Sequence, residues 1–201
     1  MLGLSAAPTG HPLNMGMLGM HGNLAPNVMT NQCDLLIAVG MRFDDRVTGD
    51  LHTYAKQAKV IHFEIDPSEV GKIVKPTVAV LGNCKQTLAQ VTELVEPARH
   101  QAWIDGFKPY AEKEYNKVID AALNPKDGPL LMGEVVRRVS EAANNEAIMV
   151  TDVGQNQLFG CRYFKYTHPR SIQKHARGRE IIDKAMQRYY GFDSRTLSLT
   201  W

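Results

Sequence analysis

The sequence predicts an α/β fold: an open parallel sheet with flanking helices, followed by the start of a second α/β unit. Two observations lead to this fold class. Short apolar runs recur along the chain, and each ends in glycine, proline or an acidic residue, as strands buried in a parallel sheet do. Helical patterns separate these runs, and strands that alternate with helices indicate right-handed crossover connections.

The first unit is expected to contain three strands. They lie at residues 33–40, 59–67 and 77–83. The first, CDLLIAVG, is short and almost continuously apolar, so we expect both of its faces to be covered. A short helix at 48–59 and a helical turn at 66–74 capped by Ser68 connect the strands. An amphipathic helix at 84–95 closes the unit.

The rest of the chain separates into a connection and a second unit. Several prolines and a charged helical pattern at 111–123, without a strand pattern, are typical of a linker. A helix at 129–144 and a strand at 146–154 open the second unit. The expected boundaries are 1–95 for the first domain, 96–127 for the linker, 128–171 for the second domain and 172–201 for a basic tail.

Composition argues against several classes of function. The 201 residues are 44% hydrophobic and 22% charged with a formal net charge of +2, so neither a nucleic-acid partner nor a membrane partner is indicated. The glycine- and proline-rich residues 1–22 are expected to form loops, not a signal peptide. Cys33, Cys84 and Cys161 form no paired motif, which favours free thiols in the cytoplasm. The histidines show no ligand spacing, so we expect no metal site.

Polar residues follow the expected strands at the positions where open α/β sheets bind ligands. GMRFDDR follows the first strand, and its arginines and aspartates suit phosphate, ribose or carboxylate groups, or form a salt-bridged turn. Glu64 ends the second strand, where nucleotide-binding sheets place an acid for ribose hydroxyls; a solvated acid is the alternative. TDVGQNQ ends a later strand and suits a diphosphate or an amide-rich turn. No GxGxxG motif follows any strand.

Together with the glycine-rich loop GMLGMHGN, these motifs resemble the large catalytic subunit of acetolactate synthase, over residues 2–171. MLGMHG and RFDDRVTG are the most specific of them. The resemblance implies an enzyme dependent on FAD, thiamine diphosphate and Mg²⁺ that decarboxylates pyruvate. The two-carbon fragment joins a second 2-oxo acid, pyruvate or 2-oxobutyrate, in branched-chain amino-acid biosynthesis. The resemblance also implies homo-oligomers with a regulatory subunit.

The resemblance assigns roles to individual residues. Those implied for FAD binding are Leu18, Gly19, Met20, His21, Gly40, Met41, Arg42, Phe43, Asp44, Glu64, Ile65, Asn83 and Cys84. Those implied for thiamine diphosphate are Val153, Gly154, Gln155 and Asn156. Those implied to border the substrate channel are Met20, Asp45 and Arg46. The family usually has aspartate at position 64 and an aspartate–valine pair at positions 83 and 84.

The resemblance also implies that part of the machinery has no counterpart in this chain. The glutamate that activates thiamine belongs to an N-terminal domain, and nothing here matches the GDG-type motif and asparagine that hold Mg²⁺. We therefore expect no catalytic residue and no acetolactate synthase activity in this chain alone. After THPRS the sequence leaves the family pattern, which suggests a frameshift, fusion or truncation, or a divergent terminal helix.

Two alternatives stay open. One is a related thiamine-diphosphate carboligase or a pyruvate oxidase with the same central fold. The other is a non-catalytic module that binds a flavin or another nucleotide.

Overall fold

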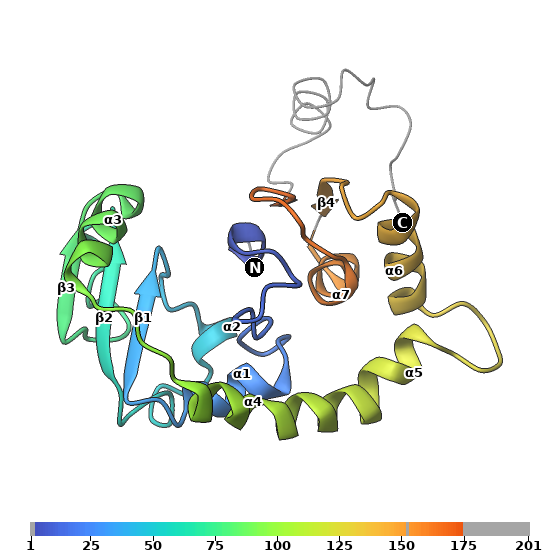
Figure 1. Cartoon of the computed structure of the whole chain (residues 1–201), viewed down its shortest axis with the longest axis horizontal. Coiled ribbons are helices and arrows are strands. Elements are labelled where there is room, and N and C mark those ends of the chain that lie inside the picture. The colour runs from blue at the N-terminus through green and yellow to red at the C-terminus, as the bar shows by residue number, and fades with distance from the viewer. Residues whose placement is uncertain (1–2, 152, 175–201) are drawn as a thin grey trace, which may run out of the picture. The chain divides into compact units, whose positions relative to one another are not determined.

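A computed structural model describes residues 3–151 and 153–174 (Figure 1). By its internal contacts the chain divides into two compact units. One unit is Met15–Ile119, and the other combines Met1–Asn14 with Asp120–Trp201. The domain boundaries expected from the sequence remain predictions.

The first unit is built on a three-stranded parallel sheet. Its strands are β1 (Leu35–Val39), β2 (Lys59–Glu64) and β3 (Val78–Leu81), in the order β1-β2-β3. Helix α3 (Cys84–Leu94) follows β3 and contacts β2 (Figure 1). The α/β class, the parallel sheet and the helix after the third strand are therefore confirmed.

The core of this unit lies on one face of the sheet. Ala38 and Val60, from neighbouring strands, cluster with Phe43, Tyr54 and Ala55. Phe43 and Ala55 both adopt positive φ angles, 54° and 43°, which non-glycine residues seldom do. Each of these two residues is buried all the same, so packing in the core outweighs the local backbone strain.

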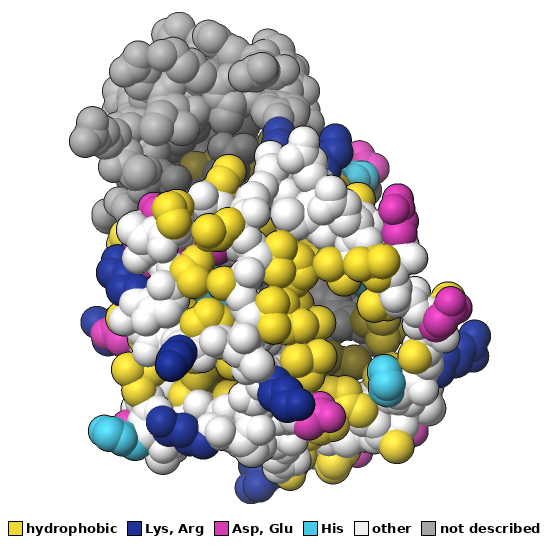
Figure 2. Space-filling model, turned by 90° about the vertical axis from the view of Figure 1, so that its left-hand side faces the viewer, with side chains coloured by type: hydrophobic (Ala, Val, Ile, Leu, Met, Phe, Trp, Pro, Cys, Tyr) yellow, Lys and Arg dark blue, Asp and Glu magenta, His cyan; other side chains and the backbone are white. Residues whose placement is uncertain are grey.

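The opposite face of β1 is open, contrary to the expectation that both faces are covered. Leu35, Ile37 and Val39 alternate along this face and are 44%, 53% and 44% exposed. Phe63, paired with Val39 on the same face, is only 2% exposed. Hydrophobic side chains gather on the side of the molecule that carries the sheet (Figure 2). Burial of a strand depends on its tertiary neighbours, and no described segment buries this part of β1.

We predict that this open face makes the isolated chain prone to self-association, because β1 also forms an edge of the sheet. Replacing Ile37 with lysine should reduce aggregation while changing the free energy of unfolding by less than about 1 kcal/mol. Light scattering and urea denaturation measure the two effects. Ala38→Lys is the matched control: Ala38 is 2% exposed on the covered face, and the change should unfold the chain. If Ile37→Lys aggregates as much as the unmodified chain, the open face of β1 is not the cause of self-association.

The connections between the strands differ from expectation. Helix α2 is only Asp45–Thr48, and hydrogen-bonded turns replace the helix expected at 48–59. Gly49, with φ 58°, ends α2. The N–H group of Ala55 donates to the Asn31 side chain (2.8 Å) instead of continuing a helix. At 66–74 the turns are capped by the side chain of Asp66, not by Ser68 as expected.

Two helices support the glycine-rich loop of this unit. Helix α1 (Leu24–Thr30), which the sequence reading did not predict, packs against α4 (Gln101–Glu114). The Glu114 carboxylate accepts a hydrogen bond from the Leu24 N–H group (3.0 Å). Helix α4 begins earlier than the helix expected at 111–123 and contains Pro109. It continues into a π-helical turn, Tyr115–Ile119.

The second unit pairs a short parallel sheet with helices. Its elements are η1 (Leu4–Ala6), α5 (Asp120–Leu123), α6 (Met132–Ala142), β4 (Met149–Thr151), α7 (Gln155–Tyr163) and β5 (Ile172–Lys174). Helix α6 and strand β4 confirm the helix and strand expected there, and α6 packs against α7. Strand β5 pairs with β4 at the start of the expected tail. The remainder of that tail, 175–201, lies outside the described residues.

Among the residues that the structure describes, no helix combines the length and the apolar character needed to cross a membrane.

Candidate functional site

The carboxyl ends of the three parallel strands meet at one edge of the sheet. The Gly40 N–H group, just beyond β1, donates to the carbonyl of Phe63 (2.8 Å), and Gly82, just beyond β3, donates to the carbonyl of Glu64 (2.9 Å). The segments that follow the strands are therefore neighbours in space. Open α/β sheets bind their ligands at this edge.

The charged loop after β1 is ordered by Asp44. Its carboxylate accepts a hydrogen bond from the Arg46 N–H group (3.0 Å), which caps α2, and pairs with the Arg42 guanidinium. The backbone hydrogen bond from Arg46, followed by the Arg42 pairing, lowers the pKa of Asp44. The Arg42 side chain is 71% exposed and accessible to a ligand. Phe43 points the other way, into the core, where it is 1% exposed.

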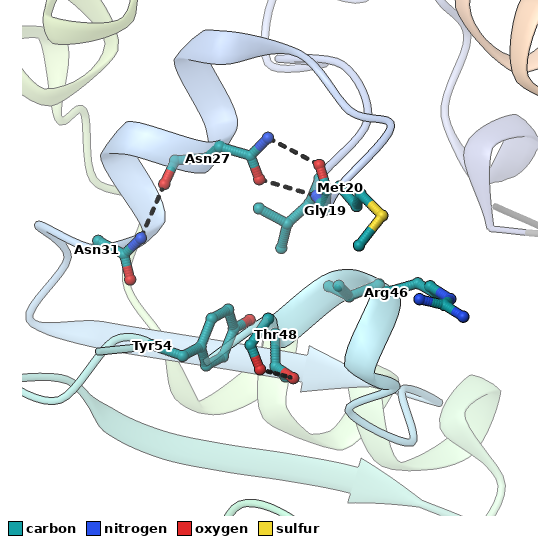
Figure 3. Close-up of a pocket in the computed structure, with 10 residues that line it drawn as sticks. Gly19, Met20, Asn27, Asn31, Arg46, Thr48 and Tyr54 are labelled. Carbon is teal, nitrogen blue, oxygen red and sulfur yellow. Dashed lines mark hydrogen bonds between the residues drawn. The ribbon is translucent and has the colours of Figure 1, made fainter. Parts of the chain in front are cut away.

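Asn27 of α1 fixes the loop that carries Leu18, Gly19, Met20 and His21 (Figure 3). Its side chain accepts from the Gly19 N–H group and donates to the Gly19 carbonyl, both at 2.9 Å. The Met20 N–H group donates to the Arg46 carbonyl (2.7 Å). Gly19 has φ 103°, and a Cβ atom there would lie 2.6 Å from the Arg46 carbonyl oxygen. Only glycine allows this approach of the loop to α2.

The structure thereby brings together the three residues expected at the substrate channel. Met20 is 62% exposed beside Arg46, and the Arg46 and Asp45 side chains are 67% and 78% exposed. In Figure 3 the Met20 and Arg46 side chains leave on the same side of the pocket.

A pocket of about 240 Å³ lies between this loop and α2 (Figure 3). It is lined by Leu18, Gly19, Met20, Asn27, Asn31, Arg46, Val47, Thr48, Gly49 and Tyr54. The Tyr54 hydroxyl is buried and has no hydrogen-bond partner among the described residues. Burial raises the pKa of Tyr54 to about 12, so it remains a neutral donor. Sites for drug-sized ligands have volumes of about 300–1,000 Å³, so this pocket suits only part of a dinucleotide.

Glu64 is the last residue of β2, and Asn83 lies just beyond β3. The Glu64 side chain is buried, and its Oε1 accepts from the N–H groups of Ile65 (2.8 Å) and Asp66 (3.2 Å). Ile65 itself is exposed. The Asn83 side chain caps α3 by accepting from the Lys85 N–H group (3.0 Å), a role that aspartate fills equally well. Cys84, the first residue of α3, is half-buried.

His62 is a residue of this region that the sequence reading missed. It is fully buried, and its Nε2 lies 3.8 Å from Glu64 Oε2. Side chains alternate between the two faces of a strand, so residues 62 and 64 lie on one face of β2. Their spacing in the sequence could therefore have predicted that His62 lies beside Glu64.

The four residues expected to meet thiamine diphosphate lie around the start of α7 in the second unit. Gly154 is the N-cap with φ 125°, and Gln155 begins the helix. Val153 is exposed, and the Asn156 side chain accepts from the Gln157 N–H group (2.7 Å). Helix N-termini present N–H groups to anions, so this arrangement suits a diphosphate.

Comparison with known proteins decides the family. Residues 1–91 match the thiamine pyrophosphate enzyme central domain. The chain is 41% identical to the acetolactate synthase large subunit of Parasynechococcus marenigrum over 170 residues. It is 36% identical to the probable acetolactate synthase large subunit of Methanocaldococcus jannaschii over 181 residues. It is also 36% identical to chloroplastic acetolactate synthase 1 of Nicotiana tabacum over 172 residues. The chain is a homologue of acetolactate synthase large subunits.

The alignments cover 82%, 86% and 85% of this chain but only 26%, 30% and 26% of these acetolactate synthases. The chain therefore spans less than a third of the length of the relatives that it matches. The resemblance inferred from MLGMHG and RFDDRVTG is confirmed.

The described residues can be compared with two of the cofactors that the resemblance implies, FAD and thiamine diphosphate. FAD suits the strand-end edge, because Arg42 is accessible and a Cβ atom at Gly40 would meet open space. The Tyr54 hydroxyl, which has no hydrogen-bond partner among the described residues, lies in the pocket between the glycine-rich loop and α2. Thiamine diphosphate suits the start of α7. Residues 3–151 and 153–174 contain no cluster of three or more His, Cys, Asp or Glu side chains that could hold a metal ion.

Proposed function

We propose that this chain forms the FAD-binding part of an acetolactate synthase large subunit, together with one side of its thiamine diphosphate site. The observation that carries the proposal is the single edge of the sheet, where Gly40, Glu64 and Asn83 lie at the carboxyl ends of three parallel strands. The loop of Gly19 and Met20 lies next to the Arg46 segment that follows β1. The homology to acetolactate synthases supports the same proposal.

The proposed cofactor contacts follow the placement of the residues. Arg42 pairs with a flavin phosphate and Glu64 accepts from a ribose hydroxyl. The rest of the site is lined by Leu18, Gly19, Met20, His21, Gly40, Met41 and Asp44, whereas Phe43 is buried in the core. Gly154 and Gln155 meet the diphosphate of thiamine diphosphate, which supplies the electron sink for decarboxylation when bound. FAD in this role is structural. Arg46, at the pocket with an exposed guanidinium, attracts the carboxylate of pyruvate or 2-oxobutyrate.

The whole protein in this proposal makes acetolactate or its 2-oxobutyrate-derived homologue for valine, leucine and isoleucine biosynthesis. It assembles as a homo-oligomer with a regulatory subunit and works with Mg²⁺. Free Cys33, Cys84 and Cys161 support a reducing compartment, and we place the protein in the cytoplasm. Burial raises the pKa of Cys33 and, to about 11, that of Cys161, which keeps these thiols unreactive.

A second candidate is a non-catalytic flavin-binding module. It is favoured by one contrast: the residues proposed for FAD occupy all three strand ends, whereas those for thiamine diphosphate are confined to the start of α7.

Binding of FAD to the 201-residue chain tests the proposal. We expect saturable quenching of flavin fluorescence, and Arg42→Ala should weaken binding about tenfold through the loss of a charge-assisted hydrogen bond. Arg99→Ala is the control, because Arg99 is an exposed arginine of the segment after α3. Absence of FAD binding would reject the proposal.

The same preparation tests the prediction that this chain holds no catalytic residue. With pyruvate, thiamine diphosphate and Mg²⁺ added, we expect FAD binding but no acetolactate. Turnover by this chain alone would contradict the prediction that it holds no catalytic residue and would exclude the non-catalytic module.

A further inference from the structure

His62 occupies a position that ordinary core packing does not explain. Its side chain is 0% exposed, and among the described residues neither ring nitrogen has a hydrogen-bond partner. The ring packs edge-on against Phe43 with a centroid distance of 5.1 Å. A buried polar group without a partner destabilises the fold, so a leucine or valine would pack here at lower free energy.

The neighbouring carboxylate of Glu64 is held unequally at its two oxygens. Oε1 accepts hydrogen bonds from the N–H groups of Ile65 and Asp66, and these two bonds occupy both of its lone pairs. Oε2 receives no hydrogen bond from any described residue and lies 3.8 Å from His62 Nε2. The Glu64 side chain retains 10% exposure. Any hydroxyl donor that approaches Glu64 from outside therefore has Oε2 as its acceptor.

We propose that His62 is a positioning residue for Glu64: its Nε2–H group donates to Oε2 and fixes that oxygen for a ligand hydroxyl. The gap between Nε2 and Oε2 exceeds a hydrogen bond of about 2.9 Å by roughly 1 Å, which a small side-chain rotation closes. One lone pair of Oε2 then faces His62, and the other accepts from the ligand. This inference rests on the proposed function, in which that hydroxyl belongs to the ribose or ribityl part of FAD.

A double-mutant cycle on FAD binding tests the inference in the full 201-residue chain. Glu64→Gln should weaken FAD binding about tenfold or more, as the loss of a hydrogen bond to a charged group does. His62→Leu should weaken it several-fold, whereas His62→Gln, which keeps an N–H donor near the Nε2 position, should stay within about threefold of the unmodified chain. The double variant His62→Leu/Glu64→Gln should bind no more weakly than Glu64→Gln alone.

Thermal denaturation of each variant separates positioning from folding. A merely structural role for His62 predicts a changed melting temperature with FAD affinity unchanged in His62→Leu. That result, or losses that add independently in the double variant, overturns the inference. If His62→Leu does not fold, the comparison of His62→Gln with Glu64→Gln still applies: loss of affinity in His62→Gln equal to that in Glu64→Gln overturns the donor role.

A ligand-free measurement keeps this inference distinguishable from the proposed function. The imidazole ¹⁵N resonances of His62 should shift on Glu64→Gln, while those of the exposed His21 and His52 should not. If the unmodified chain fails to bind FAD but the His62 resonances respond, the proposed function falls and the His62–Glu64 hydrogen bond stands. Unchanged His62 resonances overturn the hydrogen bond itself.

Discussion

Replacing Gly19 with alanine is expected to destabilise the first unit by about 3–5 kcal/mol, a large share of the 5–15 kcal/mol typical of folded domains. Gly19 has φ 103°, and a Cβ atom would lie 2.6 Å from the Arg46 carbonyl oxygen and 2.9 Å from the Val47 Cα. Both contacts are with backbone, which cannot rotate away. The loop has to withdraw from α2 and lose the hydrogen bond from Met20 to Arg46.

Urea denaturation followed by circular dichroism measures this loss, and Gly40→Ala is the matched control. Gly40 also has a positive φ, 59°, but a Cβ atom there would meet nothing within 4 Å. Gly40→Ala should therefore lose only about 1–2 kcal/mol of stability, the cost of placing a residue with a Cβ atom at a positive φ. Equal losses for the two variants would mean that the close approach of the loop to α2 contributes nothing.

Truncating Phe43 to alanine should lower the free energy of unfolding by about 3–5 kcal/mol. The ring is 1% exposed, 5.1 Å from the His62 ring and 6.5 Å from the Tyr54 ring, and it fills the centre of the core cluster. Phe43→Leu retains most of the apolar volume and should lose less than about 1.5 kcal/mol. Chemical denaturation of both variants gives the comparison.

Alanine and leucine both carry a Cβ atom at this positive φ of 54°, so the difference between the two variants reports mainly on side-chain packing. Stability of Phe43→Ala close to that of the unmodified chain would place the ring outside the core. It would then favour the flavin contact that the resemblance implies for Phe43.

The sheet and the common edge at which its strands end could be predicted from the sequence, because both depend on local patterns. CDLLIAVG and KVIHFEIDP combine apolar runs with polar ends, and both became neighbouring parallel strands. What the sequence reading missed depends on partners far along the chain. Helix α1 is capped by Glu114 of α4, and Asn31 receives the N–H group of Ala55 that a helix at 48–59 would have used internally.

The same distinction applies to the candidate site: some of its features follow from local sequence patterns, and others do not. The polar residues after each strand were predictable, because parallel strands end at a common edge. The burial of Phe43 was not, because its φ of 54° turns the ring away from the neighbouring Arg42 and Asp44. The pair of hydrogen bonds between the Asn27 side chain and the Gly19 backbone, here called the Asn27 clamp, also has no sequence pattern. It joins a loop to a helix through one side chain.

That clamp has a consequence for motion. Loop backbones usually open independently of nearby helices, but here the peptide groups of Gly19 are satisfied by a side chain of α1. Opening the loop breaks two hydrogen bonds to the helix, and fraying α1 releases the loop. The two segments thus form one cooperative unit, so amide protons in the loop exchange with solvent at a rate set by the helix.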